Sequence, residues 1–203
     1  MSTLTFPTLT HRSLNSCEFN LITNTQTFTS PLTKTTQTSE LPGSYWVATL
    51  SFQNLKEQDG RILKAFVAAL NGMAGRCYLW DMSHSAPSGV ATGIPLVNGV
   101  SQSGKSLITD GWTPSISNIM VAGDLFSVNG ELKIVTSNCN SDSGGNAILN
   151  FTPALRSSPA DNSAITVSSP TCIMRLADDQ QMRQFVMKEN RLFNPILNFI
   201  EVF

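Results

Sequence analysis

The stretch Pro42-Gly43-Ser44-Tyr45-Trp46-Val47-Ala48-Thr49-Leu50-Ser51-Phe52 decides the fold, because large apolar and small polar side chains alternate along it. A period of two places every second side chain on the same face of a β-strand. The Pro-Gly pair just before the strand marks a turn. The sequence therefore predicts a strand over residues 46–52 with one buried face, formed by Trp46, Ala48, Leu50 and Phe52.

A helix is predicted directly after this strand, over residues 54–71. Asn54 is a good N-cap residue, and Glu57 three positions later completes a capping box. Asn71-Gly72 ends the helix, since both residues tolerate the left-handed conformation. The apolar residues have the spacing of a buried helical stripe; they are Ile62, Leu63, Phe66, Val67 and Leu70. Residues 77–80, Cys77-Tyr78-Leu79-Trp80, are predicted to form the next strand.

Short strands separated by turns are predicted over residues 86–172, with no second helix. Asn129-Gly130 lies between two apolar runs and is the strongest two-residue hairpin signal. Short strands at this spacing indicate a small barrel or sandwich. The expected strands cover residues 119–121, 125–128, 132–135, 147–151 and 165–167. In the apolar tail, residues 173–176, 185–187 and 196–203 favour strands, while 177–189 also suits a helix.

Composition limits the classes of function. The chain has 203 residues, a formal net charge of -1 and 41% hydrophobic residues, enough for a substantial core. Charged residues make up 13%, about half the usual share. A nearly neutral chain has no field that attracts nucleic acid through counterion release. It also has little charge repulsion between copies, which favours self-association.

The N-terminus has no basic region followed by an apolar run, so we expect no signal peptide and synthesis in a cytosol. No apolar stretch has the length of a membrane-spanning helix. The four cysteines form no CxxC pair, so we expect buried thiols rather than disulfides or a zinc site. They are Cys17, Cys77, Cys139 and Cys172.

Two segments match catalytic patterns by their letters. Gly99-Val100-Ser101-Gln102-Ser103-Gly104-Lys105-Ser106 matches the phosphate-binding P-loop, which needs a helix directly after the loop. Gly111-Trp112-Thr113-Pro114 follows too soon for that helix, so we interpret Lys105 as a solvated turn residue. Ser141-Asp142-Ser143-Gly144-Gly145 resembles the nucleophile loop of trypsin-like proteases, but no histidine has the required context. We interpret this segment as a polar turn.

The remaining reactive residues favour ordinary roles. His11 and His84 are predicted to be surface or linker residues, and Glu57, Asp59 and Asp178-Asp179 exposed acids. Trp46, Trp80 and Trp112 are predicted to be core or interface anchors. A sugar-stacking role for Trp112 on a loop stays open as an alternative.

The order of segments resembles the distal tail proteins of long-tailed bacteriophages. A Thr/Ser-dense arm, Asn24-Thr25-Gln26-Thr27-Phe28-Thr29-Ser30-Pro31-Leu32-Thr33, precedes Glu40-Leu41-Pro42-Gly43-Ser44-Tyr45-Trp46. The predicted strand, the helix and Gly75-Arg76-Cys77-Tyr78-Leu79-Trp80 follow. Further similar segments cover residues 99–112, 122–126, 152–161 and 199–203. The likeness spans nearly the whole chain, and the order of the segments is more specific than any one of them.

This resemblance implies a mainly β protein. Residues 1–85 and 173–203 would form a β-sandwich ring domain with one helix, and residues 86–172 an inserted small β-barrel of the oligonucleotide/oligosaccharide-binding type. Copies would form a ring, usually a hexamer, at the distal end of the tail tube. That ring would join the tail tube protein to the baseplate hub or tail-tip protein, with tail fibre or receptor-binding proteins as further partners.

The expected location is the tail tip of the virion, after assembly in the bacterial host cytoplasm. The resemblance implies no enzyme activity, no catalytic, cofactor-binding or metal-binding residues, no membrane and no sequence-specific nucleic acid. We expect the arm over residues 24–34 to reach a neighbouring subunit or tube ring as an edge strand or an extended arm. Two alternatives stay open: a host-surface carbohydrate-binding module, and a nucleotide hydrolase that depends on Lys105.

Overall fold

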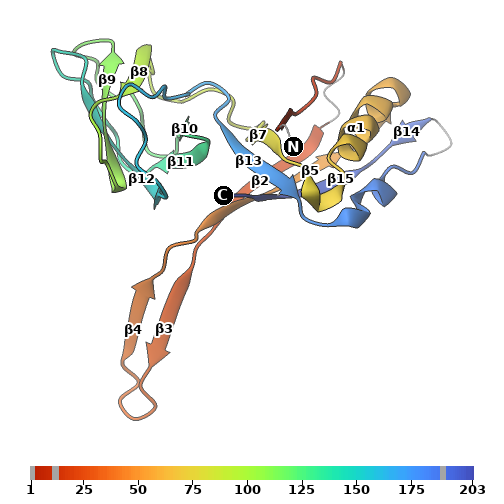
Figure 1. Ribbon diagram of the computed structural model, residues 1–203, viewed down its shortest axis with the longest axis horizontal. Coiled ribbons are helices and arrows are strands. Elements are labelled where there is room, and N and C mark those ends of the chain that lie inside the picture. The colour runs from red at the N-terminus through yellow and green to blue at the C-terminus, as the bar shows by residue number, and fades with distance from the viewer. Residues whose placement is uncertain (1–2, 11–13, 188–190) are drawn as a thin grey trace.

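The protein is mainly β, with two larger sheets and a hairpin that projects from the body (Figure 1). The computed structural model describes residues 3–10, 14–187 and 191–203. One sheet carries the α-helix, and the other curls into a half-barrel at the opposite end of the body.

The first sheet has six strands and combines strands from residues 4–80 with strands from residues 171–201. Only the pair at one edge, β1 with β7, is parallel, and the other neighbours are antiparallel. In spatial order the strands are β1 (Leu4–Thr5), β7 (Cys77–Trp80), β13 (Thr171–Leu176), β15 (Ile196–Glu201), β5 (Tyr45–Phe52) and β2 (Leu14–Ile22).

The alternation in β5 is confirmed. Trp46, Ala48, Leu50 and Phe52 are each at most 4% exposed, while the residues between them are half-buried. This buried face belongs to the same hydrophobic cluster as Leu63, Phe66 and Val67 of helix α1 (Glu57–Ala69) and Leu70 directly after it. The buried face of the strand, predicted from a period of two, and the buried stripe of the helix, predicted from a period near 3.6, therefore contribute to one core.

The helix is shorter than predicted, and the expected capping box is wrong. Asn54 has a φ of 57° and precedes a short strand, β6 (Leu55–Lys56), which pairs with β14 (Leu192–Phe193). The N-cap position belongs to Lys56, with no side-chain hydrogen bond. Pairing with a strand from the distant tail has displaced the local cap. At the other end Asn71 and Gly72 are left-handed, which confirms the predicted stop, and the 3-10 helix η1 (Gly72–Ala74) follows.

The glycine inside the helix has a packing reason. A Cβ added to Gly60 would lie 2.3 Å from Cδ2 of Phe193. Phe193 is 5% exposed and can approach the helix backbone only because the side chain at position 60 is absent.

The second sheet has five antiparallel strands, and β9 to β12 are connected as a Greek key. The predicted hairpin at Asn129-Gly130 is confirmed, with φ values of 52° and 77°. In spatial order the strands are β10 (Leu125–Val128), β11 (Glu131–Val135), β12 (Ala147–Leu155), β9 (Gly104–Trp112) and β8 (Gly93–Val97).

Two of the predicted short strands do not form. Residues 119–121 and 165–167 each make a single bridge, Met120 with Cys139 and Thr166 with Ser127. The Asp124 carboxylate accepts hydrogen bonds from the backbone N–H groups of Val121, Ser88 and Gly89, which folds the first segment into a loop. Side-chain bonding of this kind competes with a strand ladder.

The two sheets share part of one core. The half-barrel encloses its own cluster around Phe126, Phe151 and Trp112. Leu125 and Leu132, from the hairpin of β10 and β11, instead belong to the cluster of the six-stranded sheet. The half-barrel is therefore packed against the sheet and not merely tethered to it.

The tail turns back as a 3-10 helix, η2 (Asp179–Gln184), so the helical alternative for part of 177–189 is the better one. The Asp178 carboxylate accepts from the Gln180 N–H and caps this helix. The strand expected at 185–187 is wrong, since only Met187 bridges to Phe193. Residues 188–190 lie outside the described residues.

Candidate assembly surface

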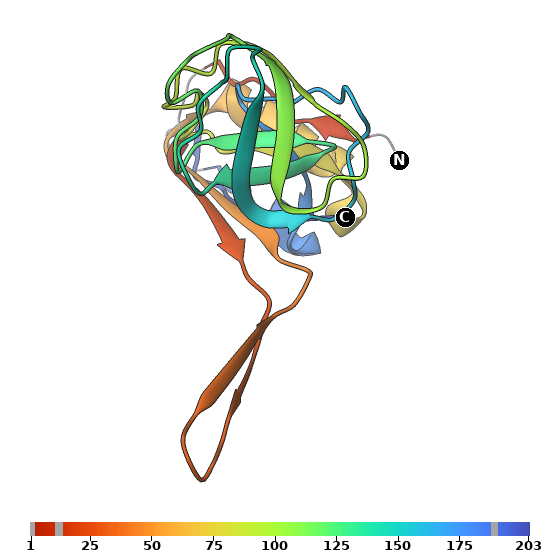
Figure 2. The ribbon, with the colours of Figure 1, turned by 90° about the vertical axis from the view of Figure 1, so that its left-hand side faces the viewer.

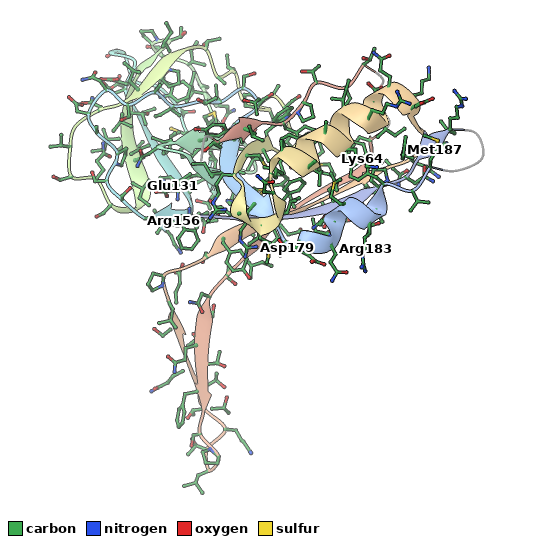
Figure 3. All side chains as sticks on the ribbon, turned by 45° about the vertical axis from the view of Figure 1, so that its right-hand side comes forward. Lys64, Glu131, Arg156, Asp179, Arg183 and Met187 are labelled. Atoms are coloured by element: carbon green, nitrogen blue, oxygen red, sulfur yellow. The ribbon has the colours of Figure 1, made fainter. Side chains whose placement is uncertain are left out.

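The predicted arm is one half of a β-hairpin. Strand β3 (Thr25–Thr29) pairs antiparallel with β4 (Thr36–Glu40), and all ten strand residues are exposed. The hairpin extends away from the body (Figure 2), and beyond its base no other part of the described chain lies beside it (Figure 3). Neither outer edge of this ribbon has a strand partner in the described residues.

The two faces of the arm differ in chemistry. Register pairs Thr27 with Thr38 and Thr29 with Thr36, so one face carries threonines. The other face carries Gln26, Phe28, Gln37 and Ser39, with the Phe28 side chain 64% exposed. Apart from Glu40, which pairs with Thr25 at the arm base, the two strands thus offer neutral hydrogen-bonding groups and one large apolar side chain to a partner.

The turn at the end of the arm has a defined shape. The Ser30 N–H donates to Thr35 O at 2.9 Å and the Lys34 N–H to Ser30 O at 3.0 Å. The Thr33 N–H also donates to Ser30 Oγ. Leu32 lies at this turn and is 91% exposed, the largest exposed fraction among the large hydrophobic residues that the structure describes.

The base of the arm is fixed to the body. β2 and β5 pair from Leu14 to Ile22 and run directly into the two arm strands. The Leu41 N–H donates to Asn24 O, and Asn24 Nδ2 donates to Pro42 O, both at 2.9 Å. Gly43 follows with a φ of 105°, which a residue with a side chain rarely adopts.

A groove of about 550 Å³ lies between the arm base and the half-barrel. The half-barrel contributes the start of β9 and the end of β12, and Phe203 closes one side. Most of the side chains are apolar, including Leu41, Pro153 and Leu155. Phe203 is 74% exposed and lies 4.0 Å from the Arg156 guanidinium, a cation–π contact.

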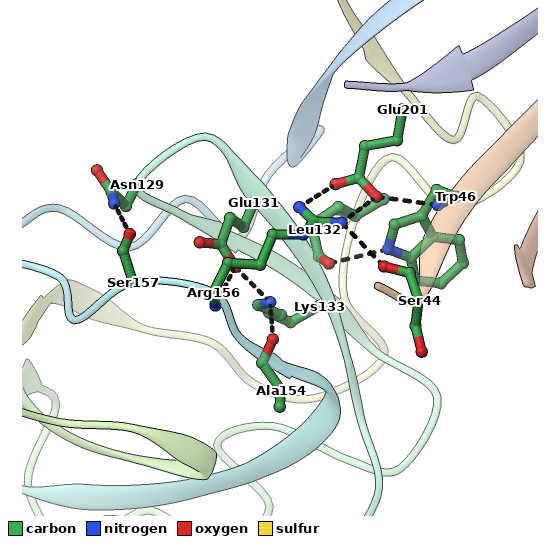
Figure 4. Close-up of polar contacts among 10 residues, drawn as sticks. All are labelled: Ser44, Trp46, Asn129, Glu131, Leu132, Lys133, Ala154, Arg156, Ser157 and Glu201. Carbon is green, nitrogen blue, oxygen red and sulfur yellow. Dashed lines mark hydrogen bonds and ion pairs between the residues drawn. The ribbon is translucent and has the colours of Figure 1, made fainter. Parts of the chain in front are cut away.

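An ion pair at this groove joins the two sheets (Figure 4). Arg156 donates to both carboxylate oxygens of Glu201, at 2.9 and 2.7 Å, and to Ser44 O at 3.0 Å. The Glu201 carboxylate also accepts from the Trp46 N–H at 2.9 Å. Trp46 in turn donates its indole N–H to Leu132 O at 2.9 Å. Burial lowers the pKa of Arg156, but the hydrogen bonds and charge of Glu201 outweigh it and raise that pKa overall.

A second buried pair lies next to the first. Lys133 is fully buried, and its Nζ donates to Glu131 Oε2 at 2.6 Å and to Ala154 O at 2.9 Å. Desolvation lowers the pKa of Lys133, and the Glu131 carboxylate opposes this shift. Among the described residues, every buried side-chain nitrogen or oxygen has a partner. These charges therefore have fixed places in the junction between the sheets.

The structure places the P-loop pattern in a loop and a strand. Residues 104–112 form β9, where the phosphate-binding architecture needs a helix. Lys105 is thus a strand residue rather than the predicted turn residue, and its Nζ pairs with Glu40 of the arm at 2.7 Å. The two side chains are 45% and 59% exposed. This geometry is a contact between arm base and half-barrel, with no phosphate cradle.

The protease-like segment is a turn, as interpreted. Asp142 Oδ1 accepts from the backbone N–H groups of Gly144 and Asn146, both at 2.8 Å. Hydrogen bonds from Asn146, first its side chain and then its backbone, lower the pKa of Asp142. Ser141 Oγ donates to Thr113 O and is held inside the half-barrel.

The only Ser-His-Asp grouping that we find in the described residues lies in the linker after β7. His84 Nδ1 lies 3.0 Å from Ser83 Oγ and 3.2 Å from Asp81 Oδ2. A triad needs serine and aspartate on opposite ring nitrogens, whereas here one nitrogen faces both. Cys17 Sγ donates to Asp81 Oδ1 at 3.5 Å. The pKa of this thiol is raised to about 11, and burial is the largest cause. His11 lies outside the described residues.

Trp112 is 3% exposed, and its indole N–H donates to Thr109 Oγ1 at 2.8 Å. The ring is part of the half-barrel core, so the sugar-stacking alternative for it is wrong. Trp46 is buried and Trp80 half-buried, as expected of core anchors. Cys77, Cys139 and Cys172 are buried, while Cys17 is half-buried.

The predicted acids are mostly structural. Glu57 pairs with Arg61 and Arg191, and Asp59 accepts from the Thr10 N–H and is buried rather than exposed. Asp179 accepts from the Met73 N–H at 2.8 Å. Within residues 3–10, 14–187 and 191–203, no three metal-ligating side chains gather into a possible metal site.

The comparisons with known proteins give no family: no protein-family model and no curated protein matches the chain. None of the described helices has the length and apolar character needed to cross a membrane.

The sequence did not single out Arg156, Glu201 or the groove. The two charged residues are 45 positions apart, in two separate segments, 152–161 and 199–203, and no sequence spacing pairs them. The one available signal was chemical: isolated charges in apolar segments of a chain with few charges tend to be paired.

Proposed function

We propose that this protein is a structural component of a phage tail. In this proposal it forms a ring at the distal end of the tail tube and joins the tube to the baseplate hub or tail tip. The observation that carries the proposal is the projecting arm, with ten exposed strand residues and two outer edges that pair with no other described strand. The order of sequence segments that resembles distal tail proteins supports the same role.

The arm has little to stabilise it on its own. A two-stranded hairpin without an apolar face is at best marginally stable in water. Unpaired strand edges are also sites where another chain can add a strand. The only charged side chain between Asn24 and Ser39 is Lys34, so a partner can bury this surface with little charge desolvation. An arm of this kind is suited to binding another subunit.

The body supplies a fixed platform for the arm. In this proposal, the six-stranded sheet with α1 is the ring domain, and the half-barrel of β8 to β12 is the outer barrel of the oligonucleotide/oligosaccharide-binding type. The buried Arg156–Glu201 pair and the shared core hold the two parts together. This rigid connection would transmit a defined orientation from the ring to whatever proteins contact the barrel. The role needs no catalytic group and no cofactor.

The test of this proposal is electron microscopy of the phage particles that contain the protein. An antibody against this chain should label the distal tip of the tail. Purified protein at high micromolar concentration should show closed rings in negative stain. Label on the capsid or along the whole tube, together with purified protein that stays monomeric, would reject the proposal. Glycan binding by such a monomer would favour the carbohydrate-binding alternative, for which the buried Trp112 offers no support.

A further inference from the structure

We propose that the turn at the end of the arm, residues 30–35, binds in the groove at the arm base of a second copy. The inference rests on the proposed function and specifies which two surfaces form the contact between neighbouring subunits. One chain carries both halves: a turn with an exposed Pro31-Leu32 pair, and a groove lined mostly by apolar side chains.

The turn has the features of a preorganised ligand. Its backbone hydrogen bonds fix the conformation before binding, so less conformational freedom is lost on association. Pro31 and Leu32 present apolar surface at the outermost point of the arm. Burying one leucine side chain strengthens an association by about ten- to hundredfold.

The groove has a matching size and charge. Its volume of about 550 Å³ lies in the range of pockets that hold small ligands. Its charged residues are already paired, Lys105 with Glu40 and Arg156 with Glu201. An occupant with little charge therefore meets no unpaired group. The one charge of the turn, Lys34, would approach Glu40 at the rim, where that carboxylate is more than half exposed.

The occupant must come from another copy. Each arm strand has five residues and spans about 17 Å, with the turn beyond it. The paired strands hold the turn at the far end of the arm (Figure 1), whereas residues of the arm base line the groove. A turn that fills the groove of the next copy repeats as a head-to-tail contact, and such a contact generates a ring or a filament.

Cysteine cross-linking tests the contact. Protein with Leu32→Cys is mixed with protein carrying Ala154→Cys in the groove, both in a Cys17→Ser background that removes the half-exposed native thiol. Ile148→Cys, exposed on the half-barrel and outside the groove, is the matched control. We expect the 32–154 disulfide dimer to form at least tenfold faster than the 32–148 dimer.

A charge at the tip gives a second readout. Because Leu32 is solvent-exposed, Leu32→Asp should keep the wild-type unfolding midpoint but weaken assembly at least tenfold, while Leu32→Met should assemble normally. The proposed contact is wrong if the wild type forms rings and Leu32→Asp assembles equally well, or if Leu32→Cys cross-links to positions 154 and 148 at the same rate. Either result would leave the proposed function standing. Wild-type protein that never assembles would instead reject the proposed function itself.

Discussion

Removal of the Arg156 side chain tests whether the buried ion pair holds the two sheets together. Arg156→Ala deletes three hydrogen bonds and leaves the Glu201 carboxylate, with 1% of its side chain exposed, bonded only to the Trp46 N–H. Breaking a buried pair from one side typically costs about 3–5 kcal/mol. We expect a loss in this range in the free energy of unfolding, measured by urea denaturation.

Two further variants separate this effect from general damage. Arg61→Ala removes an exposed pair with Glu57 and should cost less than about 1 kcal/mol. In a Glu201→Gln background, Arg156→Ala no longer leaves a buried charge. Its destabilisation, measured as the loss in the free energy of unfolding, should therefore be smaller than in the wild-type background by more than about 1 kcal/mol. If Arg156→Ala costs no more than Arg61→Ala, or if Glu201→Gln gives no relief, the ion pair does not stabilise the junction.

Three other variants test separate parts of the structure. Burial raises the pKa of Cys77 from 9.0 to about 12, so the fold retains this proton after the unfolded chain has lost it. The contribution of this thiol to the free energy of unfolding should be fully present below pH 9 and fall by about 1.4 kcal/mol per pH unit between pH 9 and about 12. Cys77→Ala should remove that part of the pH dependence, as measured by denaturation at a series of pH values. Gly60→Ala should lower the melting temperature despite the better helix propensity of alanine, because the new methyl group meets Phe193, and Phe193→Leu should restore part of the loss. Lys105→Ala should change the free energy of unfolding by less than about 1 kcal/mol, because its pair with Glu40 is exposed, and nucleotide hydrolysis above background by the wild type but not the variant would refute this interpretation.

The sequence predicted correctly those features that depend on interactions between neighbouring residues. The face of β5, the hairpin at Asn129-Gly130 and the left-handed helix stop at Asn71-Gly72 each depend on a few neighbouring residues. The β-rich class followed from these same signals.

Long-range pairing accounts for the errors. Asn54 has the chemistry of an N-cap, yet the pairing of β6 with the distant β14 moves the helix start to Glu57. The arm was expected as a single extended segment, while the structure pairs it with β4, whose Thr-rich sequence carries no apolar alternation. The groove forms only where arm base, β9, β12 and Phe203 converge, and no sequence window contains all four.

Native mass spectrometry of an armless variant tests the central claim most directly. Replacing residues 25–40 by Asn-Gly joins Asn24 and Leu41, which are already hydrogen-bonded, through a two-residue turn. The account predicts a folded monomer of this variant at concentrations where the wild type forms rings. Rings of the variant at the same concentration as the wild type would contradict it.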